Sequence, residues 1–139
     1  MANFDIEFYK VILAEGGYVN NPNDNGEETY LGISRKYNPN WDGWREIDCL
    51  KKIYGVKNIT KRLKENRTIT NSAKRVYRYK YWNPLELDDI PNQKIAHQLF
   101  DTAVNCGLNT AIRLAQKVLG MTVTGKWDDA LKHNLMNYE

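Results

Sequence analysis

The chain has 139 residues, of which 42% are hydrophobic and 27% are charged, and its formal net charge is +3 at pH 7. This composition is that of an ordinary globular protein and excludes a fibrous or intrinsically disordered chain. The length suits one domain with its own core and is short for two. No apolar run approaches the roughly 20 residues of a membrane-spanning helix. We therefore predict a single domain over residues 1–139, without a membrane span.

The first residues, Met1-Ala2-Asn3-Phe4-Asp5, contain neither the basic segment nor the apolar core of a signal peptide. From this pattern we expect synthesis in the cytoplasm. Any work on the cell wall would then depend on a holin or on another non-classical route of export.

Metal and redox chemistry find little support in the sequence. Cys49 and Cys106 lie far apart and in no metal-binding or redox spacing, and His97 and His133 have no partner pattern. We expect two reduced cysteines packed as small apolar residues, with no metal and no cofactor.

Positive charge is concentrated in residues 51–80. They hold eleven Lys or Arg residues and one acid, Glu65, for a net charge of +10, so the remainder carries −7. Such a block attracts polyanions, among them nucleic acid, anionic wall polymers and phospholipid headgroups. A solvated helix face explains it equally well. No nucleic-acid-binding motif accompanies the basic residues, so we expect no nucleic-acid partner.

Residues 4–15 are predicted to form an amphipathic helix, because apolar residues recur there at helical spacing: Phe4, Phe8, Val11 and Ile12. Asn3 is suited to cap the start of this helix. Gly16 and Gly17 are suited to end it.

Glu15 lies in the last turn of this predicted helix, three residues after Ile12 and four after Val11. Its side chain therefore points toward the buried stripe. Partial desolvation and the negative end of the helix macrodipole both disfavour the ionised carboxylate. A carboxylic acid that stays protonated near neutral pH is what a general acid needs. The alternative is a glutamate that bends out of the capping turn into water.

A second carboxylate follows in a loop rich in Asn, Gly and Pro. Asp24 lies nine residues after Glu15, and Thr29 lies five residues further on. Glycosidases use two carboxyl groups on either side of the scissile bond, and a loop folding over the helix end would bring Asp24 opposite Glu15. The alternative for Asp24 is an Asx-turn residue before Gly26.

The run Glu-Gly-Gly-Tyr-Val-Asn-x-Pro-x-Asp-x-Gly at residues 15–26, followed by Thr29 and Gly32-Ile33, resembles the signature of the glycoside hydrolase family 108 N-acetylmuramidases of bacteria and phages, also known as secretion activator proteins. The resemblance continues in residues 100–107 and 115–120. It implies a lysozyme-like, mainly α fold, cleavage of peptidoglycan glycan, and Glu15 as the catalytic acid. The order Glu, Asp, Thr is similar to that of phage lysozymes, in which the Thr helps to hold the attacking water.

The sequence departs from the family pattern beside this candidate site. Glu27 replaces the second glycine of the usual Gly-Gly pair, and Tyr30 stands where a small polar residue is common. These changes bear on loop conformation and substrate fit more than on the identity of the acid.

Six further residues are candidates for substrate binding. Aromatic faces stack on sugars, and the same rings also fill cores. We assign Trp44 to the core and Trp41 to a sugar-binding groove, and Tyr79 and Trp82 would face the glycan. Asp101 and Asn105 share one helix face, where they either hydrogen-bond to each other or, by the resemblance, line the cleft. The whole substrate-binding set is Tyr18, Asn20, Trp41, Trp82, Asp101 and Asn105.

The remaining elements follow from helical spacing and from turn residues. Helices are predicted over residues 44–54, 57–66, 93–106 and 109–119, with Ile53 and Tyr54 ending the apolar stripe of the first and Asn109 capping the last. Another helix is capped by Thr70 or Asn71 and ends at Asn83-Pro84. Residues 16–34 form the active-site loop, with Thr29–Ser34 as one short strand.

The C-terminal part, residues 93–139, resembles the helical segment of peptidoglycan-binding proteins and is expected to be integral to the domain. Thr124 and Asp128 replace the usual Asp and Gly of that motif. We therefore expect a helical ending, with Leu131 and Leu135 packed inward, and no binding role.

These observations predict a mainly α, lysozyme-like domain with a small β-hairpin near the active site. We expect a monomeric glycoside hydrolase that cleaves the β-1,4 bond between N-acetylmuramic acid and N-acetylglucosamine in the glycan strands of peptidoglycan. Glu15 would protonate the leaving oxygen, Asp24 would stabilise the transition state or steer water, and Thr29 would help to place that water. Two alternatives stay open: a lytic transglycosylase on the same fold, and a non-catalytic module that binds peptidoglycan or a polyanion.

Overall fold

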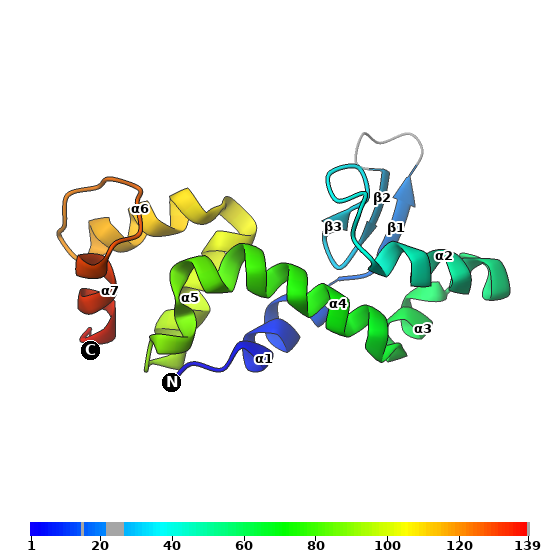
Figure 1. The fold of residues 1–139 in the computed structure, drawn as a ribbon, viewed down its shortest axis with the longest axis horizontal. Coiled ribbons are helices and arrows are strands. Elements are labelled where there is room, and N and C mark those ends of the chain that lie inside the picture. The colour runs from blue at the N-terminus through cyan, green and yellow to red at the C-terminus, as the bar shows by residue number, and fades with distance from the viewer. Residues whose placement is uncertain (15, 22–26, 139) are drawn as a thin grey trace. The chain divides into compact units, whose positions relative to one another are not determined.

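A computed structural model of the chain describes residues 1–14, 16–21 and 27–138 (Figure 1). Helices dominate, and the strands form a three-stranded antiparallel sheet. The predicted fold class, mainly α and lysozyme-like with a small β element, is confirmed. Two compact units are present, one of residues 8–76 and one of residues 1–7 with 77–139. The prediction of a single domain stays a prediction.

The unit of residues 8–76 contains the sheet. Its elements in chain order are the π-helix η1 (Phe8–Leu13), the strands β1 (Tyr18–Asn21), β2 (Glu27–Tyr30) and β3 (Ile33–Ser34), and the helices α2 (Gly43–Tyr54), α3 (Ile59–Glu65) and α4 (Arg67–Tyr77), whose last residue begins the other unit. The strands lie in the order β1-β2-β3.

Strand alternation gives the sheet a buried and an outer face. Tyr18 pairs with Tyr30 across β1 and β2, and Tyr30 pairs with Ile33 across β2 and β3. Tyr30 and Ile33 are buried, whereas Val19, next to Tyr18, is 54% exposed. The segment predicted as one strand, Thr29–Ser34, instead turns at Leu31 and Gly32, which both have positive φ.

Helices α2 and α3 follow the predictions. Helix α2 ends at Gly55, whose φ of 76° is one that glycine adopts readily, and α3 lies within the predicted basic segment. The predicted cap of α4 at Thr70 or Asn71 is wrong. The Asn66 Oδ1 atom accepts a hydrogen bond from the Ile69 backbone N–H at 3.0 Å, so Asn66 caps the helix, which begins at Arg67.

The single helix predicted over residues 4–15 is instead a short α-helix, α1 (Phe4–Glu7), followed by the π-helix η1. The helix predicted to end at Asn83-Pro84 is α-helical only as far as Tyr77 and continues as the π-helix η2 (Arg78–Trp82).

The other unit is helical in the part that the structure describes. Its elements are α1 (Phe4–Glu7), η2 (Arg78–Trp82), η3 (Asn83–Leu85), η4 (Leu87–Asp89), α5 (Gln93–Cys106), α6 (Leu108–Val118) and α7 (Asp129–Met136). An aromatic cluster lies in its core. The rings of Phe4, Trp82 and Phe100 meet edge to face, with centroids 5.3 to 5.8 Å apart.

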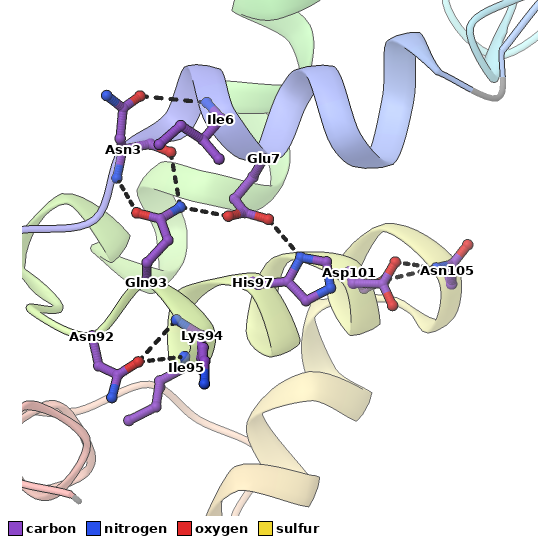
Figure 2. Close-up of polar contacts among 10 residues, drawn as sticks. All are labelled: Asn3, Ile6, Glu7, Asn92, Gln93, Lys94, Ile95, His97, Asp101 and Asn105. Carbon is purple, nitrogen blue, oxygen red and sulfur yellow. Dashed lines mark hydrogen bonds and ion pairs between the residues drawn. The ribbon is translucent and has the colours of Figure 1, made fainter.

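A buried carboxylate ties α1 to α5. The Glu7 side chain is fully buried, accepts a hydrogen bond from Gln93 Nε2 and contacts His97 Nδ1 (Figure 2). Asn3 caps α1 as predicted, because its Oδ1 atom accepts a hydrogen bond from the Asp5 N–H at 2.9 Å. The sequence pattern did not reveal that Glu7 is buried and bound to α5, because its position is that of an ordinary acid in the first turn of a helix.

The C-terminal segment is organised by a buried amide. Gln116 is 1% exposed, and its Oε1 atom accepts from the backbone N–H groups of Thr124 and Gly125 at 3.0 Å each. Leu131 and Leu135 pack inward as predicted.

Asn109 does not cap α6. Its Nδ2 atom donates to the Gly125 carbonyl instead, and the helix follows Gly107 directly. Cys49 and Cys106 are free thiols, as expected, but both are exposed rather than packed. Cys49 lies on the exposed side of α2, and Cys106 is the last residue of α5. Helical spacing alone does not show whether such positions are covered by another element.

Candidate active site

The two carboxylates that the sequence singles out, Glu15 and Asp24, lie outside the described residues. The structure describes the chain on both sides of them: η1 before Glu15, and the strands β1 and β2 before and after Asp24 in the sequence. The site is therefore built from these flanking elements.

Gly16 lies just after the π-helix η1 and just before β1. Its backbone N–H donates to the Ile12 carbonyl at 2.9 Å, a hydrogen bond that closes the turn after the helix. A Cβ atom at this position would lie 2.5 Å from Leu31 Cδ2 and 2.7 Å from Leu31 Cα. Gly16 is therefore required by the close approach of the helix end to the β2–β3 turn.

The start of β1 is held from the other side by α3. The Tyr18 backbone N–H donates to Thr60 Oγ1 at 3.0 Å. A Cβ atom added at Gly17 would lie 3.6 Å from its nearest neighbour, Thr60 Oγ1. This is an ordinary contact distance, so Gly17, unlike Gly16, has room for a side chain. Residues 16–18 thus connect the helix end, the sheet and α3.

A buried carboxylate on β2 is the electrostatic centre of this unit. Glu28 is 7% exposed and accepts hydrogen bonds from three side chains: the Tyr18 hydroxyl, Arg35 Nη1 at 2.9 Å and Lys51 Nζ at 2.8 Å. Burial by itself raises the pKa of Glu28, but the hydrogen bonds from Lys51, Tyr18 and Arg35 together lower it below its usual range. Glu28 is therefore an anion at neutral pH.

Arg35 extends the network to helix α2. Its Nη1 and Nη2 atoms donate to Asp48 Oδ1 and Oδ2 at 2.8 Å each, a bidentate pair, while Nη1 also donates to Glu28. The hydrogen bonds from Arg35 lower the pKa of Asp48. Tyr18 has a raised pKa, first through burial and then through its bond to Glu28. The network joins β1, β2 and α2 through side-chain hydrogen bonds, and we call this arrangement the frame.

The predicted residues of the hairpin divide between the two faces of the sheet. Asn20 lies directly opposite Glu28, so Tyr18, Asn20 and Glu28 share the inner face. Thr29 pairs with Val19 and lies on the outer face. The structure brings Tyr18 and Asn20 together and turns Thr29 away from them.

The two tryptophans expected to stack on sugars are buried. Trp41 is 9% exposed and packs edge to face against Trp44, with ring centroids 5.1 Å apart. Trp82 is fully buried, and its Nε1 atom donates to Asp88 Oδ1 at 2.9 Å. The expectation that these rings are open to a glycan is wrong, because both fill cores. Tyr79, also considered for this role, is 77% exposed.

Asp101 and Asn105 belong to helix α5 in the other unit. Asn105 Nδ2 donates to the Asp101 carbonyl and to Asp101 Oδ1, at 2.9 and 3.0 Å (Figure 2). This is the helix-surface hydrogen bonding that the sequence offered as the alternative to a cleft wall. A role in substrate binding stays a prediction.

The sequence interpretation missed Glu28, Arg35 and Lys51. One signal was present: with Tyr30 inside, strand alternation places Glu28 on the same inner face. A buried carboxylate is stable only with cationic partners. The positions of those partners depend on the turn after β3 and on the packing of α2, so residue spacing along the chain could not identify Arg35 and Lys51.

Within residues 1–14, 16–21 and 27–138 there is no cluster of three or more His, Cys, Asp or Glu side chains suited to a metal ion. The same part of the chain contains no helix long and apolar enough to cross a membrane.

The fold is mainly helical and lysozyme-like, and a small sheet follows the helix η1. This combination is that of the lysozyme-like glycoside hydrolases. The family model Glycosyl hydrolase 108 matches residues 8–107, and the chain belongs to this family. Membership supports glycoside hydrolase activity and a peptidoglycan-hydrolase type of role.

The chain is also similar to a solved structure, that of Brucella abortus SagA. The two are 27% identical in sequence, the TM-score is 0.62, and the match covers 98% of this chain and 70% of SagA. No curated protein shows significant similarity to the chain.

Proposed function

We propose that the chain hydrolyses the β-1,4 bond between N-acetylmuramic acid and N-acetylglucosamine in peptidoglycan, with Glu15 as the general acid. The proposal rests on family membership and on the pattern in residues 15–26. Retaining and inverting glycosidases both need one carboxyl group that is protonated when the leaving oxygen departs.

The observation that supports the choice of Glu15 is the state of two other carboxylates within residues 8–76, Glu28 and Asp48. Glu28 and Asp48 are bound by Arg35 and Lys51, and hydrogen bonds from these cations lower the pKa of both. An acid held as an anion has no proton to give at neutral pH, so these two are unsuited to the role.

The other catalytic roles are proposals of the same kind. Asp24 stabilises the oxocarbenium-like transition state or steers water, and Thr29, on the outer face of β2, helps to place that water. For substrate binding, the exposed side chain of Asn20 is the strongest candidate, because the Tyr18 hydroxyl is already bound to Glu28. The enzyme works as a monomer, needs no metal or cofactor, and reaches the wall by a holin or another non-classical route.

The test is digestion of purified peptidoglycan by the wild type, Glu15→Gln and the control Glu65→Gln, which changes an exposed glutamate on α3. Released fragments are identified by mass and by a reducing-end assay. The wild type and the control should release reducing muropeptides. Glu15→Gln should lose about 100-fold or more of this activity. A urea titration establishes that each variant is folded.

Each outcome decides between the candidates. Anhydro-muropeptides from the wild type would assign the chain to the lytic transglycosylases, which use one acid and need no water. Equal activity of the wild type and Glu15→Gln would show that Glu15 is not the acid. No cleavage by any of the three proteins would favour a binding module.

A further inference from the structure

The corner between helices α2 and α3 exposes apolar side chains that the sequence pattern assigns to the core. Ile53 and Tyr54 end the apolar stripe of α2, yet they are 67% and 49% exposed. Val56, two residues on, is 56% exposed. Residues 52–58 are exposed without interruption, and Figure 1 shows α2 leading into this corner and α3 leaving it. Three neighbouring apolar residues in water call for an explanation.

The same corner is strongly basic. Lys52, Lys57, Lys61 and Arg62 are exposed, and none of the four has an ion-pair partner among the residues that the structure describes. The nearest acid on α2, Asp48, is occupied by Arg35 through two hydrogen bonds. The corner is thus a net positive surface.

Arg62 connects the two features. Its guanidinium carbon lies over the Tyr54 ring, 3.6 Å from the ring centroid, which is a cation–π contact. This contact joins α3 to the end of α2 and keeps a positive charge directly beside the exposed apolar residues. Apolar and cationic groups therefore form one surface, which we name the basic corner, residues 52–62.

We propose that the basic corner docks onto the surface of an anionic phospholipid membrane. Lysine and arginine near an anionic leaflet each contribute about 1 kcal/mol of binding, roughly a fivefold gain in partition coefficient. Ile53, Tyr54 and Val56 are placed to enter the boundary between headgroups and acyl chains, as the apolar side chains of interfacial segments do. The partner is thus a lipid surface that offers both negative charge and an apolar layer.

The aliphatic residues of the basic corner favour a membrane over nucleic acid or an anionic wall polymer as the partner. Nucleic acid binds through cations and through open aromatic faces on which bases stack, and it gains nothing from Ile53 or Val56. The one aromatic residue of the corner, Tyr54, already has Arg62 over its ring. An anionic wall polymer would likewise use the cations alone. A lipid surface is the partner that uses both kinds of side chain.

The test measures the partition of the full chain onto vesicles by flotation. Vesicles of phosphatidylglycerol and phosphatidylcholine are compared with vesicles of phosphatidylcholine alone, at low and at physiological salt. The wild type should bind the anionic vesicles, should not bind the neutral ones, and should bind less as salt rises. The readout does not depend on peptidoglycan cleavage, so it stands whatever the result for Glu15.

Two pairs of matched variants separate charge from apolar contact. The charge variant carries Lys52→Gln, Lys57→Gln and Lys61→Gln, and its control carries Lys94→Gln, Lys117→Gln and Lys126→Gln, three exposed lysines of the other unit. The charge variant should bind the anionic vesicles about 100-fold more weakly, from the roughly fivefold effect of each cation. The control should bind within a few-fold of the wild type.

The apolar variant carries Ile53→Asn and Val56→Asn, and its control carries Leu114→Asn and Val118→Asn, which are 49% and 71% exposed. The apolar variant should lose vesicle binding several-fold and the control should not. Absence of vesicle binding by the wild type would overturn the proposal, and so would equal behaviour of either variant and its control. If the apolar variant binds like the wild type while the charge variant does not, the partner is a polyanion and not a membrane.

Discussion

The Lys51 ammonium lies 2.8 Å from the Glu28 carboxylate, and this ion pair joins helix α2 to strand β2. Both side chains are largely removed from water, with 24% and 10% of their surface exposed. A buried pair of this kind is costly to break, because the remaining charge loses both its partner and its hydration. The frame that flanks the candidate catalytic segment therefore depends on Glu28.

Glu28→Gln should lower the free energy of unfolding by about 3 kcal/mol at pH 7. The amide cannot balance the charges of Lys51 and Arg35, and it presents a donor to one of the three groups that now donate to Glu28. Urea denaturation measures the loss. Glu65→Gln, at an exposed site, should change the value by less than about 0.5 kcal/mol. Equal losses in the two variants would contradict the role given to Glu28.

The same network predicts acid sensitivity. The pKa values of Glu28 and Asp48 are lowered in the folded chain, so the stability that these groups contribute is present above their unfolded pKa values. For Glu28, this contribution to stability begins to fall as the pH drops below about 4.5, the ordinary pKa of a glutamate. It is lost once the pH has fallen through the lower pKa of Glu28 in the folded chain. Urea midpoints from pH 7 down to pH 3 measure this effect. The difference between the wild type and Glu28→Gln should shrink over that range, and a constant difference would contradict the assignment.

Gly16→Ala and Gly17→Ala form a matched pair. At Gly16 the new methyl group would meet the Leu31 backbone at 2.7 Å, so the helix end and the β2–β3 turn must separate, at a cost of about 1–3 kcal/mol. If Glu15 is the acid, displacement of its neighbour should also reduce muramidase activity, by up to about 100-fold. At Gly17 the nearest atom is 3.6 Å away, and stability should change by less than about 0.5 kcal/mol. Similar effects at both positions would rule out the packing explanation.

Trp82→Ala should lower the free energy of unfolding by about 3–5 kcal/mol, because the indole fills the centre of the Phe4–Phe100 cluster. Tyr79→Ala removes a ring that is 77% exposed and should have little effect on stability. Thermal unfolding followed by near-ultraviolet circular dichroism compares the two. If the Trp82 variant keeps its stability and loses only affinity for substrate, this prediction is wrong and Trp82 stacks on the sugar instead.

Glu7 and His97 should be energetically coupled. Replacing His97 by Ala leaves the buried Glu7 side chain with Gln93 as its remaining side-chain partner in the described residues, whereas in Glu7→Gln the carboxyl group that contacts His97 is already absent (Figure 2). A double-mutant cycle with Glu7→Gln and His97→Ala, measured by urea denaturation, should therefore give a coupling energy of about 1 kcal/mol or more. Additive effects would show that the contact contributes nothing.

Local spacing was sufficient for the helices that end in glycine. Helix α5 begins and ends where the pattern predicts, because Asn92 supplies a cap and Gly107, with a φ of 95°, supplies a stop. Helix α2 ends at Gly55 for the same reason. Such signals act within one turn of the chain, so they can be recognised without knowledge of the fold. The family pattern in residues 15–26 is equally local.

Burial of individual side chains was not predictable in this way. An apolar stripe predicts which face of a helix turns inward, but it does not say how far the core reaches along that face. Trp41 was expected to be open and is buried, whereas Ile53 was expected to be buried and is open. The difference depends on which element packs against each residue, and that is a property of the whole unit.

By itself, the sequence determined the family, the mainly helical class, the ends of most helices and the choice of Glu15 as the candidate acid, because each of these depends on residues close together in the chain. Only the tertiary structure decided that Glu28 meets Lys51 and Arg35, that Gly16 is required by Leu31, and that Tyr18 and Thr29 face opposite sides of the sheet. The physical reason is that ion pairs and close packing join segments whose separation in sequence carries no signal, and their energies depend on burial that arises only once the chain has folded.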